Sequence, residues 1–450
     1  MSKPIDEKYL SADTPMTPEL LQEYITLHGR RQPRYRRLRE AYENLYPIYK
    51  MPRKAKYKPD NRMSVNFAKY ITDTMGGYFI GIPIKVAHPV SSVSDYLNYL
   101  DSYNNQDDNN AELSKLCDIF GHGYEMLFTD EHSEIGITYL SPEEAFIIYD
   151  DSILHRPLYG VRYYRDKNKL YGSFSDNQKV YYFSSDNGYA ISEGEPHYFD
   201  EVPIIEYVEN EEKHGIFEDV LELINGYNKA LSEKANDVDY YADAYLKILG
   251  TKLDNESLKS LRDSRILNFE GQDADKLIVE FLQKPDSDGT QENLINRLEK
   301  LIFQISMVAN ISDESFGNAS GISLKYKLQS MSNLAQTKER KFRAGMNKRY
   351  KMICSYPGNG LKEDDWIDLD IKFTRNIPSN LLEESQIAGN LSGITSQKTQ
   401  LSVISCVEDV DKEIEQINAE KDKTEYQTDY PTNRTGEENG VLAGQAETTK

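Results

Sequence analysis

The sequence predicts an α+β fold, in which a β-rich first half precedes long amphipathic helices. Six short runs rich in β-branched and aromatic residues lie between positions 124 and 208, separated by clusters of Asp, Gly, Asn and Ser. This is the pattern of an antiparallel sheet. After His214 the apolar residues recur every three or four positions, which is the period of a helix.

The composition narrows the classes of function. The 450 residues, enough for about three domains, carry 74 acidic and 53 basic side chains, a net charge of −21. Proteins that grip nucleic acid tightly are usually basic, so a static nucleic-acid binder is disfavoured, whereas a channel through which DNA slides remains compatible. No apolar run reaches the roughly 18 residues that span a membrane, and the first twenty residues lack the apolar stretch of a signal peptide.

Cysteine usage indicates a reducing compartment. Cys117, Cys354 and Cys406 lie far apart in the sequence, and an odd, sparse set argues against a disulfide framework. We therefore expect a cytosolic, soluble protein.

Helices are predicted at the N-terminal end of the chain. Thr17-Pro18-Glu19-Leu20 provides a hydroxyl cap and an early proline, so a helix is predicted over 17–48. Residues 30–58 are strongly basic within an acidic chain. Two interpretations stay open for them: contact with nucleic acid or an acidic partner, or an exposed face that balances neighbouring acidity.

The next elements lead into the sheet. A helix over Asn66 to Tyr78 is predicted to close at Gly76-Gly77, followed by a strand at 79–86, a polar loop at 102–110 and a helix at 111–120. The predicted strands are YEMLFT, IGITYL, AFIIYD, YGVRYY, KVYYFS and VPIIEYV.

Two long helices and a compact insertion dominate the middle of the chain. The apolar stripe that begins at Phe217 and ends at Tyr245 predicts a helix of about 30 residues, or about 45 Å. A second stripe runs from Leu294 to Val308. Between them, 251–287 is predicted to hold a short helix and the strand-like runs RILNFE and KLIVEFL. The pattern indicates either a helical hairpin with a tip or an ordinary helical subdomain with an inserted β-hairpin.

The last third of the chain is mostly helical. A small-residue loop at 310–321 leads into a basic helix from about Ile322 to Ile353, and WIDLDIKFT is predicted to be a strand. Further helices are predicted at 379–390, 396–405 and 409–422. From about Glu425 the composition predicts disorder.

No catalytic motif is found. The sequence contains no phosphate-binding GxxxxGK[ST], no HExxH, no GxSxG and no dinucleotide fingerprint. Cys117, His122 and His132 match no standard metal-site spacing. We therefore expect a protein that is not an enzyme and binds no cofactor and no metal.

The chain resembles the portal proteins of tailed double-stranded DNA phages, in the branch common among long-tailed phages of Gram-positive bacteria. Four segments carry the resemblance: NFAKYITDTMGGYFIGIPIKV (66–86), LCDIFGHGYEMLFTDEHSEIGITYLSPEEAFIIYDD (116–151), EVPIIEYVENEEKHGIFEDVLELINGYNKALSEKANDVDYYADAYLKILG (201–250) and SDESFGNASGISLKYKLQSM (312–331). The C-terminal run 390–420 is also similar to the family. Together they cover most of residues 60–420 in the family's order.

The resemblance implies a portal fold with an α/β wing, a stem of two long helices, a small α/β clip and a helical crown. The implied divisions are 1–213 and 309–378 for the wing, 214–250 and 289–308 for the stem helices, 251–288 for the clip, 379–424 for the crown and 425–450 for a disordered tail.

The resemblance also implies a tunnel loop that constricts the DNA channel, formed by Ser312, Asp313, Glu314, Ser315, Phe316, Gly317, Asn318, Ala319, Ser320 and Gly321. Phe316 either brushes DNA or anchors the loop to the adjacent helix, and both interpretations stay open. Lys325 and Lys327 are expected to contact the DNA backbone rather than base edges. Most other charges of that helix are expected to be intersubunit or solvated.

The implied function is that of a ring subunit at one capsid vertex, with about twelve copies in a closed ring. Packaging, retention and ejection of the genome pass through this ring. The implied partners are double-stranded DNA, a terminase, a head-completion adaptor, and the major capsid and scaffolding proteins, with no membrane. The implied location is the virion, with assembly in the host cytoplasm. The rival hypotheses are another virion protein, such as an adaptor, and an enzyme with an unrecognised site.

Overall fold

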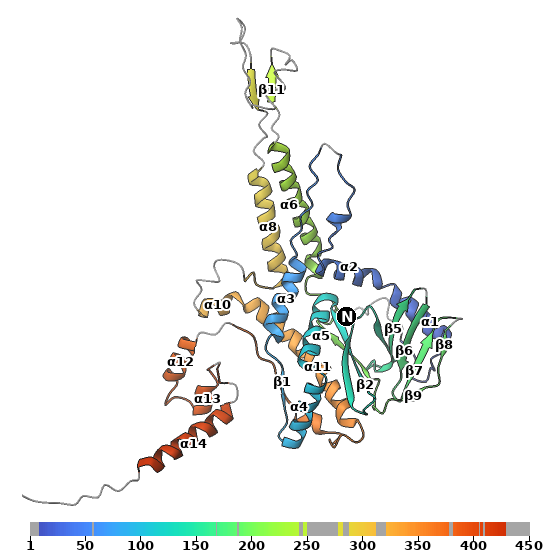
Figure 1. The fold of residues 1–450 in the computed structure, drawn as a ribbon, viewed down its shortest axis with the longest axis vertical. Coiled ribbons are helices and arrows are strands. Elements are labelled where there is room, and N and C mark those ends of the chain that lie inside the picture. The colour runs from blue at the N-terminus through green and yellow to red at the C-terminus, as the bar shows by residue number, and fades with distance from the viewer. Residues whose placement is uncertain are drawn as a thin grey trace, which may run out of the picture. The chain divides into compact units, whose positions relative to one another are not determined.

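The computed structural model divides the chain into two compact units, Met1–Asn376 and Ile377–Lys450, drawn in Figure 1. It describes residues 9–55, 58–167, 169–186, 189–242, 246–249, 278–281, 288–311, 321–377, 381–404, 406–407 and 410–428. Helices and strands are mixed throughout the first unit. The predicted α+β class is therefore confirmed.

A three-stranded antiparallel sheet lies at the centre of the first unit. Strand β2 (His122–Thr129) pairs on one side with β3 (Ile135–Leu140) and on the other with β10 (Ile204–Val208). Helix α5 (Gln106–Phe120) packs on β2, and α11 (Gln329–Ser355) packs on β10. The main apolar core forms between these helices and the sheet.

A second antiparallel sheet has its own core. Its strands run in the order β4 (Ala145–Tyr149), β5 (Pro157–Asp166), β6 (Lys169–Ser175), β7 (Lys179–Ser184) and β8 (Ala190–Ile191), and β9 (Glu195–Pro196) also pairs with β7. Apolar residues of α1 (Pro18–Gly29) join the strands in this core. The predicted strands are confirmed, but β6 was not predicted because Gly172, Ser173 and Ser175 give a weak strand signal. Gly172 is required there, since a Cβ would lie 2.3 Å from the carbonyl oxygen of Arg162.

The predicted continuous helix over 17–48 is wrong. It is divided into α1, α2 (Gln32–Tyr42) and the short 3-10 helix η1 (Pro47–Lys50). Pro33 lies in the first turn of α2, where a missing N–H and a fixed φ are tolerated, but it cannot continue the hydrogen bonding of α1. The predicted start is confirmed, because the Thr17 hydroxyl accepts the N–H of Leu20 at 3.2 Å.

Two predictions about the following helices are also wrong. Gly76-Gly77 lies inside α3 (Phe67–Ile80), and the helix ends at Gly81, where a Cβ would lie 2.2 Å from the carbonyl oxygen of Gly77. The predicted polar loop at 102–110 is the join between α4 (Ser91–Tyr103) and α5. Its acidic residues stand in the first turn of α5, where they favour a helix electrostatically.

A long helix pair leaves the central core. Helix α6 (Leu221–Ala242), preceded by the 3-10 helix η2 (Glu218–Val220), packs against α8 (Asp288–Ser306). Strands β11 (Leu246–Leu249) and β12 (Ile278–Phe281) pair with each other between the two helices in sequence. A strand within KLIVEFL is therefore confirmed, whereas RILNFE and the predicted short helix lie outside the described residues.

The predicted basic helix is interrupted once. Helix α10 (Gly321–Lys327) and α11 are separated by Leu328. WIDLDIKFT contains the 3-10 helix η4 (Asp365–Asp368) and the short strand β13 (Asp370–Lys372), which pairs with β1 (Lys85–Ala87). Of the strand predicted at 79–86, only Lys85 and Val86 lie in β1, and residues 79 and 80 are the end of α3.

The second unit is helical in its described part. It contains α12 (Leu381–Asn390), α13 (Gln397–Leu401) and α14 (Val410–Thr428). All three predicted helices are present, and α14 extends past 424, while residues 429–450 lie outside the described residues. Across the described helices of both units, none combines the length and the apolarity needed to cross a bilayer.

Candidate functional site

The segment predicted to be the tunnel loop is described only at its end. Ser312 to Ser320 lie outside the described residues, and Gly321 is the first residue of α10. On this helix Lys325 is exposed and Lys327 is half-buried. Tyr326 between them is 77% exposed. The two predicted DNA-contact lysines therefore lie on the same short helix.

The helix pair α6–α8 is joined by apolar and polar contacts. Ile224 and Ile302 are fully buried in the main core at its base. Farther along, Lys234 pairs with Glu292, and the Gln291 side chain donates a hydrogen bond to Asp237 at 2.8 Å. The pair is therefore attached firmly at its base and held by polar contacts higher up.

Large apolar side chains of this pair remain uncovered in the single chain. Val238 on α6 is 63% exposed, and Leu294 and Ile305 on α8 are 51% and 48% exposed. The predicted apolar stripes included all three. Single exposed apolar residues are common, whereas contiguous exposed apolar surface is typical of a protein–protein contact.

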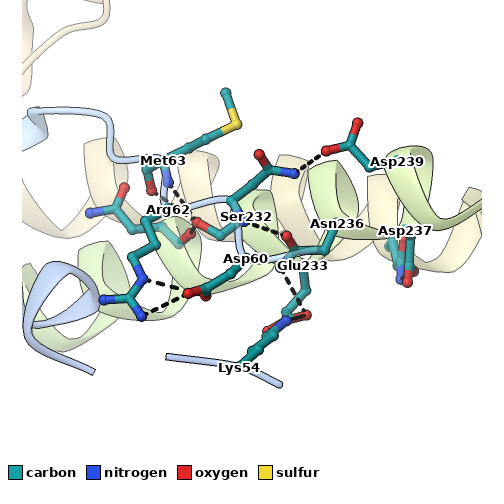
Figure 2. Close-up of polar contacts among 12 residues, drawn as sticks. Lys54, Asp60, Arg62, Met63, Ser232, Glu233, Asn236, Asp237 and Asp239 are labelled. Carbon is teal, nitrogen blue, oxygen red and sulfur yellow. Dashed lines mark hydrogen bonds and ion pairs between the residues drawn. The ribbon is translucent and has the colours of Figure 1, made fainter. Parts of the chain in front are cut away.

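An extended segment lies along α6, shown in Figure 2. We call residues 59–65 the strap. The amides of Asn61, Met63 and Val65 donate to side chains of α6 at 2.6, 2.9 and 2.8 Å. The acceptors, in that order, are the side-chain oxygens of Asn236, Ser232 and Asn228.

Side chains extend this contact at the upper end of the strap. Asn61 donates to the carboxylate of Asp239 at 2.5 Å. Lys54, just before the strap, donates to both oxygens of Glu233 at 2.9 and 2.6 Å (Figure 2). The strap and α6 are thus linked by polar contacts over nearly three helical turns.

The other edge of the strap is attached to the corner between α2 and η1. Arg62 donates to the carbonyl oxygen of Tyr49 at 3.0 Å and pairs with Asp60 at 3.0 Å. The Ser64 hydroxyl donates to the side chain of Asn44 at 2.8 Å. Alternate strap residues therefore face opposite partners, as expected for extended backbone.

The basic residues of 30–58 are largely paired within the chain. Arg34 binds Glu218 through two nitrogens, at 2.7 and 2.5 Å, and donates to the carbonyl oxygen of Lys213 at 2.8 Å. Arg39 pairs with Glu143 at 3.0 Å, and Lys54 pairs with Glu233. These contacts favour the interpretation in which the segment balances neighbouring acidity.

Two basic residues of α11 are exceptions to the expectation of solvated or intersubunit charges. Lys338 is buried between Asp118 on α5, at 2.5 Å, and Glu209, which follows β10, at 3.0 Å. Arg349 is buried against Glu125 on β2. Both pairs fix α11 to the central sheet and to the segment that leads into α6.

The cluster around Lys338 holds two carboxylates but one ammonium group. Burial raises the pKa of Asp118 to about 7, with Glu209 adding to the rise and Lys338 opposing it. Burial disfavours the charged form of Lys338, but Asp118 and Glu209 outweigh it and raise the lysine pKa. One oxygen of Asp118 has no hydrogen-bond donor among the described residues. Asp118 therefore binds a proton more readily than an exposed carboxyl does.

A third buried cluster surrounds Glu206 in the middle of β10. Glu206 accepts from His122 at 2.8 Å, from Tyr149 at 2.6 Å and from Lys213 at 3.0 Å. Burial opposes ionisation of Glu206, but Lys213 and His122 outweigh it and lower its pKa. Burial lowers the pKa of His122 itself. In the part of the chain that the structure describes, no group of three or more metal-ligating side chains is found.

Sequence reasoning missed the polar stripe of α6 and the buried charges of α11. Asn228, Ser232 and Asn236 recur every four residues, which was a readable helical period. The apolar stripe beside it obscured the signal. For Lys338 and Arg349 no local signal existed, because Asp118 and Glu125 lie 220 and 224 positions away in the sequence and Glu209 is also distant from Lys338.

Comparisons with known proteins identify a family and relatives of the chain. Residues 21–427 match the family described as phage portal protein, SPP1 Gp6-like. The portal protein of Bacillus phage SPP1 is 25% identical over 391 residues, which cover 81% of this chain and 76% of that protein. The portal protein of Clostridium phage phiCD119 is 29% identical over 233 residues, half of each chain.

Proposed function

Because the chain belongs to the SPP1 Gp6-like family of phage portal proteins, we propose that it is the subunit of a closed ring at one vertex of the capsid. About twelve copies surround a channel for double-stranded DNA. The genome enters through this channel during packaging, is retained by it, and leaves through it during ejection. Terminase and then a head-completion adaptor dock on the ring, which connects the head to the tail.

Members of this family are structural components of the virion rather than enzymes. This membership confirms the prediction that the chain is not an enzyme. In our proposal, a separate terminase therefore performs ATP hydrolysis. Changes to portal residues act on assembly and DNA retention rather than on a turnover number.

The exposed apolar face of the α6–α8 pair is the observation that carries the proposal. An isolated chain leaves Val238, Leu294 and Ile305 in water. Neighbouring copies related by rotation cover such surfaces when a head-to-tail contact closes into a ring. The helix pair would then be the stem, packed side by side around the channel.

The remaining divisions follow from the family. The wing would comprise 1–213 and 309–378, the stem 214–250 and 289–308, the clip 251–288 and the crown 379–424. The clip would meet terminase and adaptor outside the capsid, and the crown would face the interior. Major capsid and scaffolding proteins would contact the ring during assembly in the host cytoplasm.

The channel constriction is proposed at residues 312–321, with Lys325 and Lys327 close to the DNA backbone. Their placement together on α10 supports this assignment. An acidic chain with few basic residues at the bore holds DNA weakly, which suits a duplex that has to slide.

Negative-stain microscopy together with mass photometry tests the proposal. Rings with a central hole, at a mass of roughly twelve copies of the 51.8 kDa chain, are expected. A monomer or dimer at every salt and protein concentration would contradict it. That outcome would return attention to an adaptor or another virion protein.

A further inference from the structure

The buried residues of α6 change in chemistry along the helix. In its lower part, Leu221, Ile224 and Tyr227 are buried in the main apolar core. Above them the buried residues that face the strap are Asn228, Ser232 and Asn236, at 0%, 2% and 5% exposure. The lower part is therefore held by apolar burial, whereas the upper part is held by hydrogen bonds.

The strap and the helix have matching repeats. Two residues of extended chain advance about 6.7 Å, and four residues of α-helix advance about 6.0 Å. Amides at 61, 63 and 65 therefore stay in step with side chains at 236, 232 and 228 over three contacts. We call these three contacts rungs. The chains run antiparallel, and each strap–α6 hydrogen bond described here uses an α6 side chain.

This geometry leaves the helix intact if the rungs open. The backbone hydrogen bonds of α6 do not depend on the strap, because the strap contacts only its side chains. The strap keeps its own attachment through Arg62 to Tyr49 and through Ser64 to Asn44. Opening therefore separates α6 from a segment that stays fixed to the α2–η1 corner.

Opening also exposes little apolar surface. No residue from 59 to 65 is fully buried and Met63 is already exposed, whereas Val65 packs half-buried on the main apolar core. The three rung side chains are polar, so water can replace the strap amides. Segments held by few apolar contacts open at lower free energy than the core.

We propose that the strap is a releasable clasp on α6, which opens and closes as one unit while α6 and the central core stay folded. When the clasp is closed, it fixes the direction of the upper half of the helix. When it is open, that half keeps its contacts with α8, such as Lys234 with Glu292, and can tilt only together with that helix. This proposal concerns the single chain and does not depend on ring formation.

Residue-resolved hydrogen exchange of the full-length protein tests the clasp. In the described chain the amides of Arg62 and Ser64 have no hydrogen-bond partner. We expect protection at 61, 63 and 65, fast exchange at 62 and 64, and exchange at the three rungs at least about tenfold faster than at Leu127 in β2. If the rung amides exchange as slowly as Leu127, the strap is part of the rigid core. If the rung amides are unprotected from exchange, the clasp is not formed. Either result would overturn the proposal.

Ser232→Ala and Asn236→Ala test whether the rungs act together. Loss of one rung is expected to leave the amide that lost its acceptor unprotected and to lower protection at the two remaining rung amides by the same factor, about two- to tenfold, with Leu127 unchanged. Asn225→Ala is the control. It removes a side-chain amide of α6 that contacts Glu222 rather than the strap, so the protection of the three backbone amides of the rungs should stay unchanged. A change at only the amide that lost its acceptor would overturn the single-unit clasp. An equal change at Leu127 would do so too.

Discussion

Arg349 on α11 and Glu125 on β2 form a two-pronged ion pair from which solvent is excluded. The guanidinium donates through Nε at 2.8 Å and through Nη2 at 2.6 Å, and the side chains are 0% and 1% exposed. Asn110 accepts from the same Nη2 at 2.7 Å, and Tyr207 donates to Glu125 at 2.9 Å. The pair and its two partners thus join four elements of the central core, α11, β2, α5 and β10.

Removal of the arginine charge should destabilise the fold strongly. In Arg349→Met the buried carboxylate of Glu125 loses its counter-ion, and breaking a buried pair in this way costs about 3–5 kcal/mol. Urea denaturation followed by circular dichroism measures the loss of unfolding free energy. Lys348→Met, which changes an exposed neighbour on the same helix, is the control and should change the stability by less than about 0.5 kcal/mol.

A double variant separates the lost charge pair from lost packing. Arg349→Met with Glu125→Leu removes both charges, and apolar replacement of a whole buried pair is often close to neutral. We expect the double variant to be more stable than Arg349→Met alone. If it is less stable, packing rather than the unpaired carboxylate explains the cost.

The cluster of Asp118, Lys338 and Glu209 should give the protein a pH-dependent stability. The pKa of Asp118 is raised from 3.8 to about 7, so between these values the folded chain binds more protons than the unfolded chain. This contribution stabilises the fold at low pH and is lost as the pH rises through about 7. Asp118→Asn mimics the protonated form and should become more stable relative to the wild type as the pH increases from 5 to 8.

Urea denaturation at several pH values measures this difference. Between pH 5 and 8, the unfolding free energy of Asp118→Asn is expected to rise relative to that of the wild type by more than about 1.4 kcal/mol, the equivalent of one pKa unit. Asp95→Asn, an exposed carboxylate on α4, should leave the shape of the profile unchanged. A pH-independent difference between Asp118→Asn and the wild type would mean that Asp118 is ionised throughout this range.

The exposed apolar face of α8 should be needed for ring formation. Leu294→Asp places a charge on a side chain that is 51% exposed in the single chain, so the subunit should fold but fail to assemble. Mass photometry should show at least a tenfold fall in the ring fraction, which corresponds to about 1.4 kcal/mol of lost association free energy. Asn296→Asp adds the same charge at an exposed polar position of α8, and it should still form rings. Equal assembly by both variants would contradict the stem interface.

The two lysines of α10 should affect DNA rather than assembly. Lys325→Gln with Lys327→Gln removes two charges near the proposed bore. Each phosphate contact adds about one to the slope with which the logarithm of the DNA affinity falls against the logarithm of the salt concentration. We expect normal rings but less DNase-protected DNA in assembled capsids, with the deficit largest at low salt and smaller as the salt concentration rises, because the wild type then loses the same phosphate contacts. Lys348→Gln on α11 serves as the control. A normal DNA content in the double variant would exclude these lysines from DNA retention.

The fold was predictable wherever a local signal determines it. Six strands and the two long helices follow from their periods, and the α1 cap follows from Thr17-Pro18. The errors arose where one local sequence pattern is compatible with two different structures. Gly76-Gly77 is typical of a helix end, but α3 continues through it until Gly81, where the backbone approaches too closely for a side chain.

The candidate site was less predictable than the fold. A basic run on a predicted helix indicates an exposed face, yet Lys338 and Arg349 are buried because distant carboxylates meet them in the folded core. Val238 belongs to the predicted apolar stripe of α6, yet it is exposed because the buried face at that height is polar. Both errors depend on tertiary partners that no sequence window contains. The assignment of 312–321 to the tunnel loop stays a prediction.

The order in which the buried ions are synthesised has a consequence for translation. Asp118, Glu125 and Glu209 leave the ribosome long before Lys338 and Arg349, which lie 220 and 224 positions after Asp118 and Glu125. An N-terminal segment usually starts to fold as it emerges, but here three carboxylates would have to enter the core without counter-ions. A nascent chain that ends before α11 is therefore expected to stay incompletely folded. Prematurely terminated chains would then not join an assembling capsid, and so they would not block its assembly.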